Sequence, residues 1–120
     1  MSYKTGADMV AQARAKVREV TVAEMIEAID KPGAPTFLDV RERAETNLGR
    51  IPGAIVLARG SMETKIEALV PRDAKLVIYC ASGNRSAFAA VTLAEMGYTD
   101  VASLKEGFNG WAASGGEVEG

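Results

Sequence analysis

Hydrophobic residues fall into short apolar runs that alternate with longer amphipathic segments along this chain. Apolar runs lie at 36–41, 54–58 and 75–80, and a less apolar one lies at 100–104. Runs of this length predict strands, and the uninterrupted run at 54–58 predicts a strand covered on both faces. Residues 18–20 can add a short edge strand.

Helical spacing predicts an amphipathic helix over residues 5–18, which either packs on the flank of the domain or mediates self-association. Thr21 and Glu24 have capping-box spacing, so a second helix should begin there and end before Pro32 and Gly33. Residues 42–45 suggest one or two helical turns that end by Gly49.

Three more helices are predicted in the second half of the chain. One begins at Ser61 and runs through Val70, with Ile66 and Leu69 facing inward. The next covers residues 86–96, with Ser86 as its N-cap, and a short last helix covers 107–113. The tail, residues 114–120, is rich in Gly and Glu and is expected to fray.

Strands that alternate with helices predict an α/β fold, a parallel sheet with helices on both faces. Functional sites of such sheets form beyond the carboxyl ends of the strands. Asp39 and Cys80 both fall at such ends. We therefore look for the chemistry of this chain near these two residues.

Composition narrows the classes of function. The chain has 120 residues, 48% of them hydrophobic, which predicts one globular domain that buries about two-thirds of its unfolded surface. A net charge of −2 argues against a general nucleic-acid binder, and no apolar stretch is long enough to cross a membrane or to serve as a signal peptide. We expect a cytoplasmic protein.

The chain has one cysteine and no histidine. An internal disulfide is impossible, the usual zinc spacings are absent, and we expect no metal and no cofactor. Any mechanism in which an imidazole of this chain activates a cysteine or serine is also excluded.

Cys80 ends a predicted buried strand and opens a small polar loop, residues 81–86, before a helix. Backbone N–H groups and the positive end of a helix dipole stabilise a thiolate in such a place. We therefore interpret Cys80 as a nucleophile in an anion-holding loop. The alternative is an inert core cysteine, which is common at the end of an apolar strand.

Four segments of the chain resemble the rhodanese-like sulfurtransferases. They are Leu38–Glu42, Gly49–Ala54, Cys80–Ser86 and Gly97–Trp111. The resemblance implies a rhodanese-like domain over residues 19–120, after an N-terminal helical extension at 1–18. It further implies a five-stranded, mainly parallel sheet and a cysteine, Cys80, that carries sulfane sulfur as a persulfide. Arg50 departs from the family, which commonly has histidine there.

The predicted site consists of Cys80 as the catalytic residue, a substrate-binding loop and two supporting residues. The loop and supporting residues are Ala81, Ser82, Gly83, Asn84, Arg85, Ser86, Asp39 and Arg41. Arg85 can bind an anionic donor with its planar fork or can brace the loop against a carboxylate. Asp39 and Arg41 suggest a polar network that supports the loop. Ser82 and Asn84 can simply favour the turn conformation of the loop backbone.

Three functions are compatible with these residues. The first is sulfur transfer from thiosulfate or a persulfide to cyanide or a thiol, and a protein acceptor is possible. The second is a phosphatase or arsenate reductase, although Cys80 to Arg85 is one residue shorter than the Cys-x5-Arg loop of related phosphatases. The third is a persulfide relay or a regulatory module that binds a partner protein.

Overall fold

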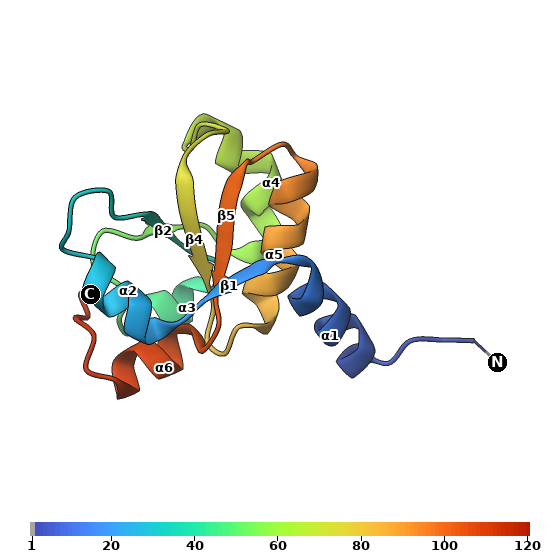
Figure 1. Cartoon of the computed structure of the whole chain (residues 1–120), viewed down its shortest axis with the longest axis horizontal. Coiled ribbons are helices and arrows are strands. Elements are labelled where there is room, and N and C mark those ends of the chain that lie inside the picture. The colour runs from blue at the N-terminus through green and yellow to red at the C-terminus, as the bar shows by residue number, and fades with distance from the viewer. Residues whose placement is uncertain (1) are drawn as a thin grey trace.

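Five parallel strands form the centre of the computed structural model, which describes residues 2–120 (Figure 1). They follow the spatial order β1-β5-β4-β2-β3, and each neighbouring pair runs parallel. The strands are β1 (Arg18–Val20), β2 (Thr36–Asp39), β3 (Ile55–Val56), β4 (Lys75–Tyr79) and β5 (Asp100–Leu104). The expected α/β fold with a five-stranded sheet is confirmed, and the sheet is wholly rather than mainly parallel.

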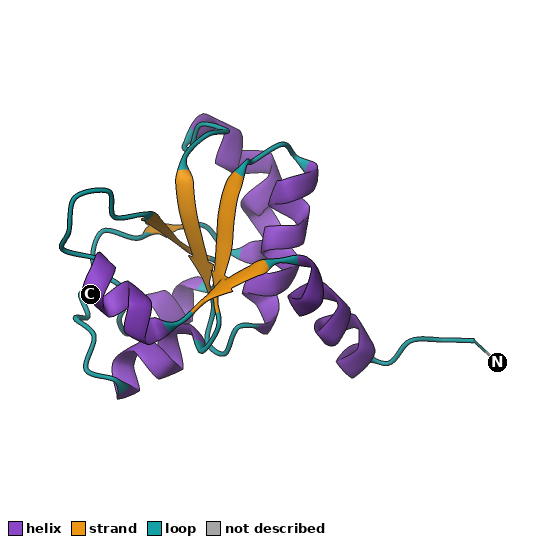
Figure 2. Cartoon of the chain, in the orientation of Figure 1, coloured by secondary structure: helices purple, strands orange, loops and turns teal. Residues whose placement is uncertain are grey.

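Helices connect the strands and cover both faces of the sheet (Figure 2). They are α1 (Gly6–Lys16), α2 (Val22–Ala28), α3 (Arg43–Thr46), α4 (Met62–Lys65), α5 (Asn84–Glu95) and α6 (Gly107–Ala113), with 3₁₀ turns η1 (Arg59–Ser61) and η2 (Ile66–Ala68). The predicted capping box of α2 is present, because Thr21 and Glu24 each bond the other's backbone N–H.

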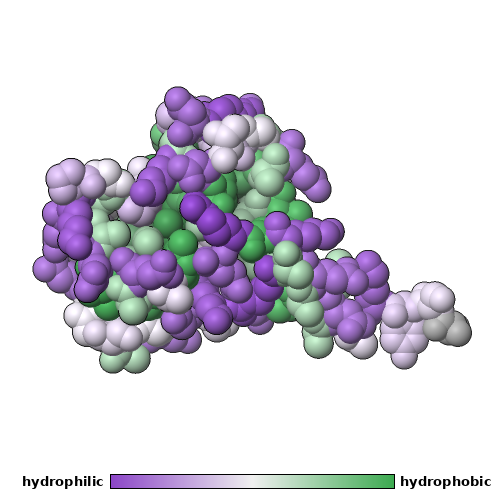
Figure 3. Space-filling view, in the orientation of Figure 1, coloured by the Kyte–Doolittle hydropathy of each residue, from purple (hydrophilic) through white to green (hydrophobic). Residues whose placement is uncertain are grey.

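The pleat of β4 divides its side chains between two cores. Leu76, Ile78 and Cys80 point toward the face covered by α4 and α5. Val77 and Tyr79 point toward the other face, where residues of α2 and α6 complete the packing. Hydrophilic residues cover most of the outer surface in the view of Figure 3, with apolar residues visible between them near the middle. Cys80 thus belongs to the α5 side of the sheet.

Two expectations for residues 54–70 were wrong. β3 has only two residues, and both are half-buried because β3 is an edge strand with one neighbour, β2. The helix from Ser61 is broken into α4 and the turn η2, and Ser61 makes no side-chain cap. A 3₁₀ turn has about three residues per turn rather than 3.6, so the inward-facing position shifts, and Val70 fills the core while Leu69 is 54% exposed.

The C-terminal tail is held in place, contrary to the expected fraying. The Trp111 Nε1–H donates to the Glu117 carbonyl at 2.7 Å. Further on, Arg50 and Glu119 exchange two backbone hydrogen bonds of 2.9 Å in an antiparallel bridge. A glycine-rich composition suggested mobility, but Gly116 packs directly on the Trp111 ring, where a side chain would not fit.

The first helix, α1, packs against α5 and lies next to β1 (Figure 1). Ala13 is its buried residue, and Thr5 caps it through a capping box with Asp8. Among residues 2–120, no helix is long and apolar enough to cross a membrane.

Gly107 at the start of α6 offers a test of how tightly this helix packs on the Cys80 loop. Its φ is +65°, and a Cβ there would overlap the backbone of Ala81 and Ser82. Gly107→Ala should lower the free energy of unfolding by about 2–4 kcal/mol, from left-handed strain and overpacking together. Urea unfolding followed by circular dichroism measures the loss.

Gly33→Ala is the matched control, because Gly33 also has a positive φ, +81°, but has open space around it. This variant should lose only about 1–2 kcal/mol from backbone strain. Equal losses in the two variants would contradict close packing between α6 and the loop.

Candidate active site

The Cys80 sulfur lies in the bend between β4 and α5. Its Sγ accepts hydrogen bonds from the Gly83 N–H at 3.1 Å and from the Ser86 N–H at 3.4 Å. Only 1% of the residue is exposed. The loop therefore curls around the sulfur and presents backbone donors to it.

These donors change the acidity of the thiol. Burial alone would raise the pKa of Cys80, since it penalises the charged form. Hydrogen bonds from the Ser86 hydroxyl and from the amides of Ser86, Ser82 and Gly83 outweigh burial, so the pKa of the Cys80 thiol is lowered. A buried, inert core cysteine has no need of such donors, so this environment favours the reactive interpretation.

Ser86 is not the N-cap of the helix, as the sequence suggested. Helix α5 begins two residues earlier, at Asn84, and its N-cap is Gly83 in a left-handed conformation with φ +99°. The Ser86 Oγ instead lies 3.5 Å from Cys80 Sγ and 2.8 Å from the Ser103 Oγ. When the sulfur is a thiolate, Ser86 donates to it and Ser103 donates to Ser86, which orients both hydroxyls toward the negative charge.

Helix α6 holds the first part of the loop from outside. The Phe108 N–H donates to the Cys80 carbonyl at 2.7 Å, and the Asn109 N–H donates to the Ala81 carbonyl at 3.0 Å. These bonds satisfy two loop carbonyls, and they fix the direction in which the following N–H groups point.

Arg85 faces Glu45 in α3. The two groups form a bidentate pair, with Nη–Oε distances of 2.8 and 2.9 Å, and each side chain is a little over one-third exposed. The hydrogen bonds from Arg85 lower the pKa of Glu45 to about 2. The guanidinium fork is therefore engaged by a carboxylate in this state, which favours the bracing alternative for Arg85.

Asp39 and Arg41 form a buried ion pair on the opposite side of the sheet from Cys80. The closest contact is 2.8 Å, and Arg41 also donates to the Gly49 carbonyl at 2.7 Å. The Arg41 guanidinium lies 4.2 Å from the centre of the Phe108 ring, and Phe108 in turn bonds the Cys80 carbonyl. The pair thus contacts the site through α6 and does not meet the thiol.

The remaining predicted positions are more exposed. Ser82 and Asn84 lie at the surface, Ala81 is half-buried, and Arg50 sits 3.7 Å from the Glu119 carboxylate. Within residues 2–120, no group of His, Cys, Asp or Glu side chains could hold a metal ion.

The sequence did not reveal four residues around the site, which are Glu45, Ser103, Phe108 and Arg14, the last of which donates to the Asn84 side chain. Ser103 could have been found, because a lone serine within a predicted buried strand needs a hydrogen-bond partner. The pairing of Glu45 with Arg85 spans 40 positions, and the contacts of Arg14 span 70 and 91, so no local pattern signals them.

Comparison with known proteins gives an independent view of the chain. The family model described as a rhodanese-like domain matches residues 21–114. A sulfurtransferase of Allochromatium vinosum is 37% identical over 79 residues, covering 66% of this chain and 73% of its own. The thiosulfate sulfurtransferase GlpE of Pseudoalteromonas translucida is 30% identical, covering 81% of this chain and 90% of its own.

A third relative is YrkF of Bacillus subtilis, whose name describes a sulfur carrier. It is 27% identical over 90% of this chain, but the chain spans only 58% of its length. Among solved structures, a protein of unknown function from Rhodopseudomonas palustris, described as a possible tyrosine phosphatase, has a TM-score of 0.86 at 34% identity. The match covers 99% of this chain and 97% of that one.

Ser86→Ala tests whether the serine hydroxyl stabilises the thiolate. A hydrogen bond to a charged group is worth about 1.5–3 kcal/mol, so the pKa of Cys80 should rise by about one. The midpoint of the thiolate titration, and the pH dependence of any thiolate-dependent reaction, should then move to higher pH by about one. Ultraviolet absorbance of the thiolate across a pH titration, taken against Cys80→Ser, measures it.

Ser114→Ala serves as the control, since Ser114 is an exposed serine at the end of α6. A Ser86→Ala titration that overlays the wild-type curve would show that the hydroxyl does not act on the sulfur.

Proposed function

Because this chain belongs to the rhodanese-like domain family, we propose that it is a sulfurtransferase in which Cys80 carries sulfane sulfur as a persulfide. The observation that carries the proposal is the set of hydrogen bonds aimed at Cys80 Sγ from Gly83 and Ser86. They lower the pKa of the thiol without help from a histidine, which this chain lacks.

The proposed cycle has two displacement steps. The Cys80 thiolate attacks the outer sulfur of thiosulfate, so that a new S–S bond forms while the S–S bond of thiosulfate breaks. Sulfite leaves with the bonding electron pair, and the negative charge stays on the terminal sulfur of the persulfide. Cyanide or a thiolate then attacks that sulfur, and the Cys80 thiolate is released unchanged.

The loop supports both steps by holding negative charge. Backbone N–H groups and the N-terminus of α5 face the sulfur, and they can stabilise the thiolate and the persulfide anion alike. No proton needs to be moved in either step. A chain with no histidine is therefore sufficient for this chemistry.

The names of two relatives bear on the sulfur donor and acceptor. The GlpE relative is named for thiosulfate, which supports thiosulfate as a donor, at 30% identity. The relative described as a sulfur carrier supports a second candidate, a persulfide relay to a partner protein. The two candidates share the Cys80 persulfide and differ only in the acceptor.

Phosphatase activity is a third candidate function, because one similar solved structure is described as a possible tyrosine phosphatase. A phosphate-binding loop uses its arginine to hold the substrate oxygens. Arg85 is instead engaged with Glu45, and the loop is one residue shorter than Cys-x5-Arg. Both features favour a sulfur substrate over a phosphate.

Incubation with thiosulfate tests the proposal directly. The intact mass under non-reducing conditions should increase by one sulfur atom, and cyanide should remove the gain while thiocyanate appears. Cys80→Ser is a clean control, because Cys80 is the sole cysteine of the chain. A wild-type protein that stays unmodified but hydrolyses an aryl phosphate would falsify the sulfurtransferase proposal.

Arg85→Ala and Glu45→Gln together test the role of Arg85. If the pair braces the loop, both variants should slow thiosulfate turnover to a similar extent and lower the stability by about 0.5–1 kcal/mol, as a partly exposed pair allows. Steady-state kinetics and urea unfolding measure both effects.

The contrary result is a split between the two variants. Glu45→Gln frees the guanidinium for substrate, so an arginine that binds the donor would give an unchanged or lower KM in Glu45→Gln and a raised KM in Arg85→Ala. Glu67→Gln is the control, because it breaks the exposed Arg72–Glu67 ion pair, which involves none of the site residues.

A further inference from the structure

Arg14 connects the N-terminal helix to the Cys80 loop. One terminal nitrogen of its guanidinium donates to the Asn84 side-chain oxygen at 3.0 Å, and the other donates to the Lys105 carbonyl at 2.6 Å. Its Nε–H donates to Glu19 at 3.0 Å. The planar fork therefore joins three segments that are far apart in the sequence.

The guanidinium also closes over the Cα of Gly83. A Cβ placed on Gly83 would lie 2.7 Å from an Arg14 Nη and 2.5 Å from the Lys105 carbonyl oxygen. The loop backbone at Gly83 is thus packed against Arg14 and the Lys105 carbonyl, which lie together on the side where a side chain would project. On its inner side, the N–H of this same residue donates to Cys80 Sγ at 3.1 Å.

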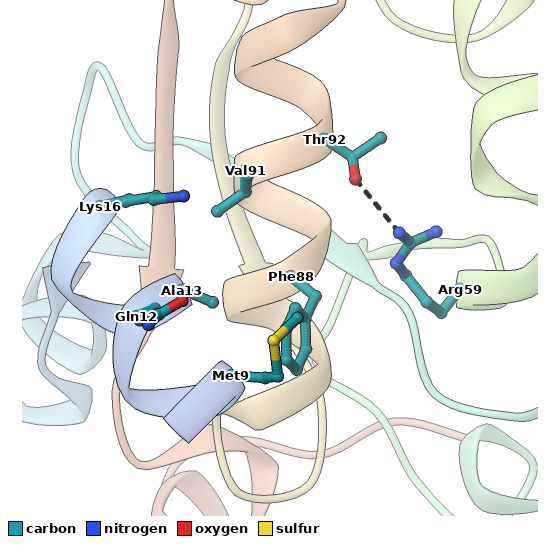
Figure 4. Close-up of a pocket in the computed structure, with 8 residues that line it drawn as sticks. All are labelled: Met9, Gln12, Ala13, Lys16, Arg59, Phe88, Val91 and Thr92. Atoms are coloured by element: carbon teal, nitrogen blue, oxygen red, sulfur yellow. Dashed lines mark hydrogen bonds between the residues drawn. The ribbon is translucent and has the colours of Figure 1, made fainter. Parts of the chain in front are cut away.

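Helix α1 is itself anchored well enough to place this arginine. Ala13 is 5% exposed where α1 packs against α5, and a surface pocket beside this contact is lined by Met9, Ala13, Phe88 and Val91 (Figure 4). The capping box at Thr5 fixes where the helix begins. The side chain of Arg14 is 26% exposed, so it is more than a solvated surface charge.

We propose that Arg14 is a positioning residue for the Cys80 thiolate, and that α1 belongs to the active site because it carries this residue. Arg14 holds Gly83 and Asn84 from outside, so that the Gly83 N–H stays aimed at the sulfur. The helix lies outside the segment matched by the family model, residues 21–114. This inference rests on the proposed function in one respect, which is that Cys80 is the reactive residue.

Arg14→Met tests this inference, since methionine keeps an apolar stem and removes the donors. Looser placement of the Gly83 N–H should raise the pKa of Cys80 and move the midpoint of its thiolate titration to higher pH by roughly 0.5–1. The readout is the ultraviolet absorbance of the thiolate across a pH titration, relative to Cys80→Ser. It needs no sulfur donor and no access of a reagent to the buried sulfur.

Arg18→Met is the matched control. It removes one positive charge and a 3.0 Å ion pair with Asp100 near the same helix, without touching the loop. Asn84→Ala breaks the contact from the loop side while Arg14 keeps Glu19 and Lys105, and it should raise the pKa in the same direction. Arg14→Lys retains the charge without the fork and should not restore the wild-type titration.

A titration of Arg14→Met that coincides with those of the wild type and Arg18→Met would overturn the inference, as would full recovery in Arg14→Lys. Circular dichroism checks that the total helix content of the variants equals that of the wild type. The proposed function fails separately, if the wild type gains no sulfur from thiosulfate while the pKa change in Arg14→Met is still seen.

Discussion

A sulfur anion can stay inside a protein only where hydrogen-bond donors replace the water it loses, and this requirement governs the region around Cys80. The residue is 1% exposed, yet the pKa of its thiol is lowered. Short backbone contacts from Gly83 and Ser86 make this possible, and the Ser86 hydroxyl adds to them. Because N–H groups of the main chain cannot rotate independently, their aim depends on the shape of the whole loop.

The shape of the loop is in turn fixed by elements that never touch the sulfur. In helix α6, the backbone N–H groups of Phe108 and Asn109 donate hydrogen bonds to two loop carbonyls. The ion pair of Arg85 with Glu45 connects the start of α5 to α3. The buried Asp39–Arg41 pair lies on the same face of the sheet as α6 and supports that helix through the Phe108 ring. A substitution in any of these elements therefore acts on the thiol by changing the direction in which the loop N–H groups point.

The sequence predicted the sheet and the place of the cysteine, because strand runs and the strand-loop-helix order are local patterns. It misjudged Ser86, since a serine near a helix start can cap the helix or bond a neighbouring sulfur, and the left-handed turn at Gly83 decides between these uses. Leu69 was misplaced for a related reason, as a break in the helix changes which residue faces inward. Ion pairs such as Arg85–Glu45 form only in the tertiary fold, so no periodic pattern in the sequence predicts them.

The same geometry bears on which substrate the loop suits. A phosphate brings several charged oxygens, and each needs a donor in a water-poor site. Here the inward amides are directed at a single sulfur atom, and the Arg85 fork is occupied by Glu45. A persulfide adds one further sulfur and leaves the total charge of the site at minus one. In the proposed cycle, the donors that stabilise the thiolate also serve the persulfide, whereas a phosphate would require Arg85 to leave its bidentate pair with Glu45.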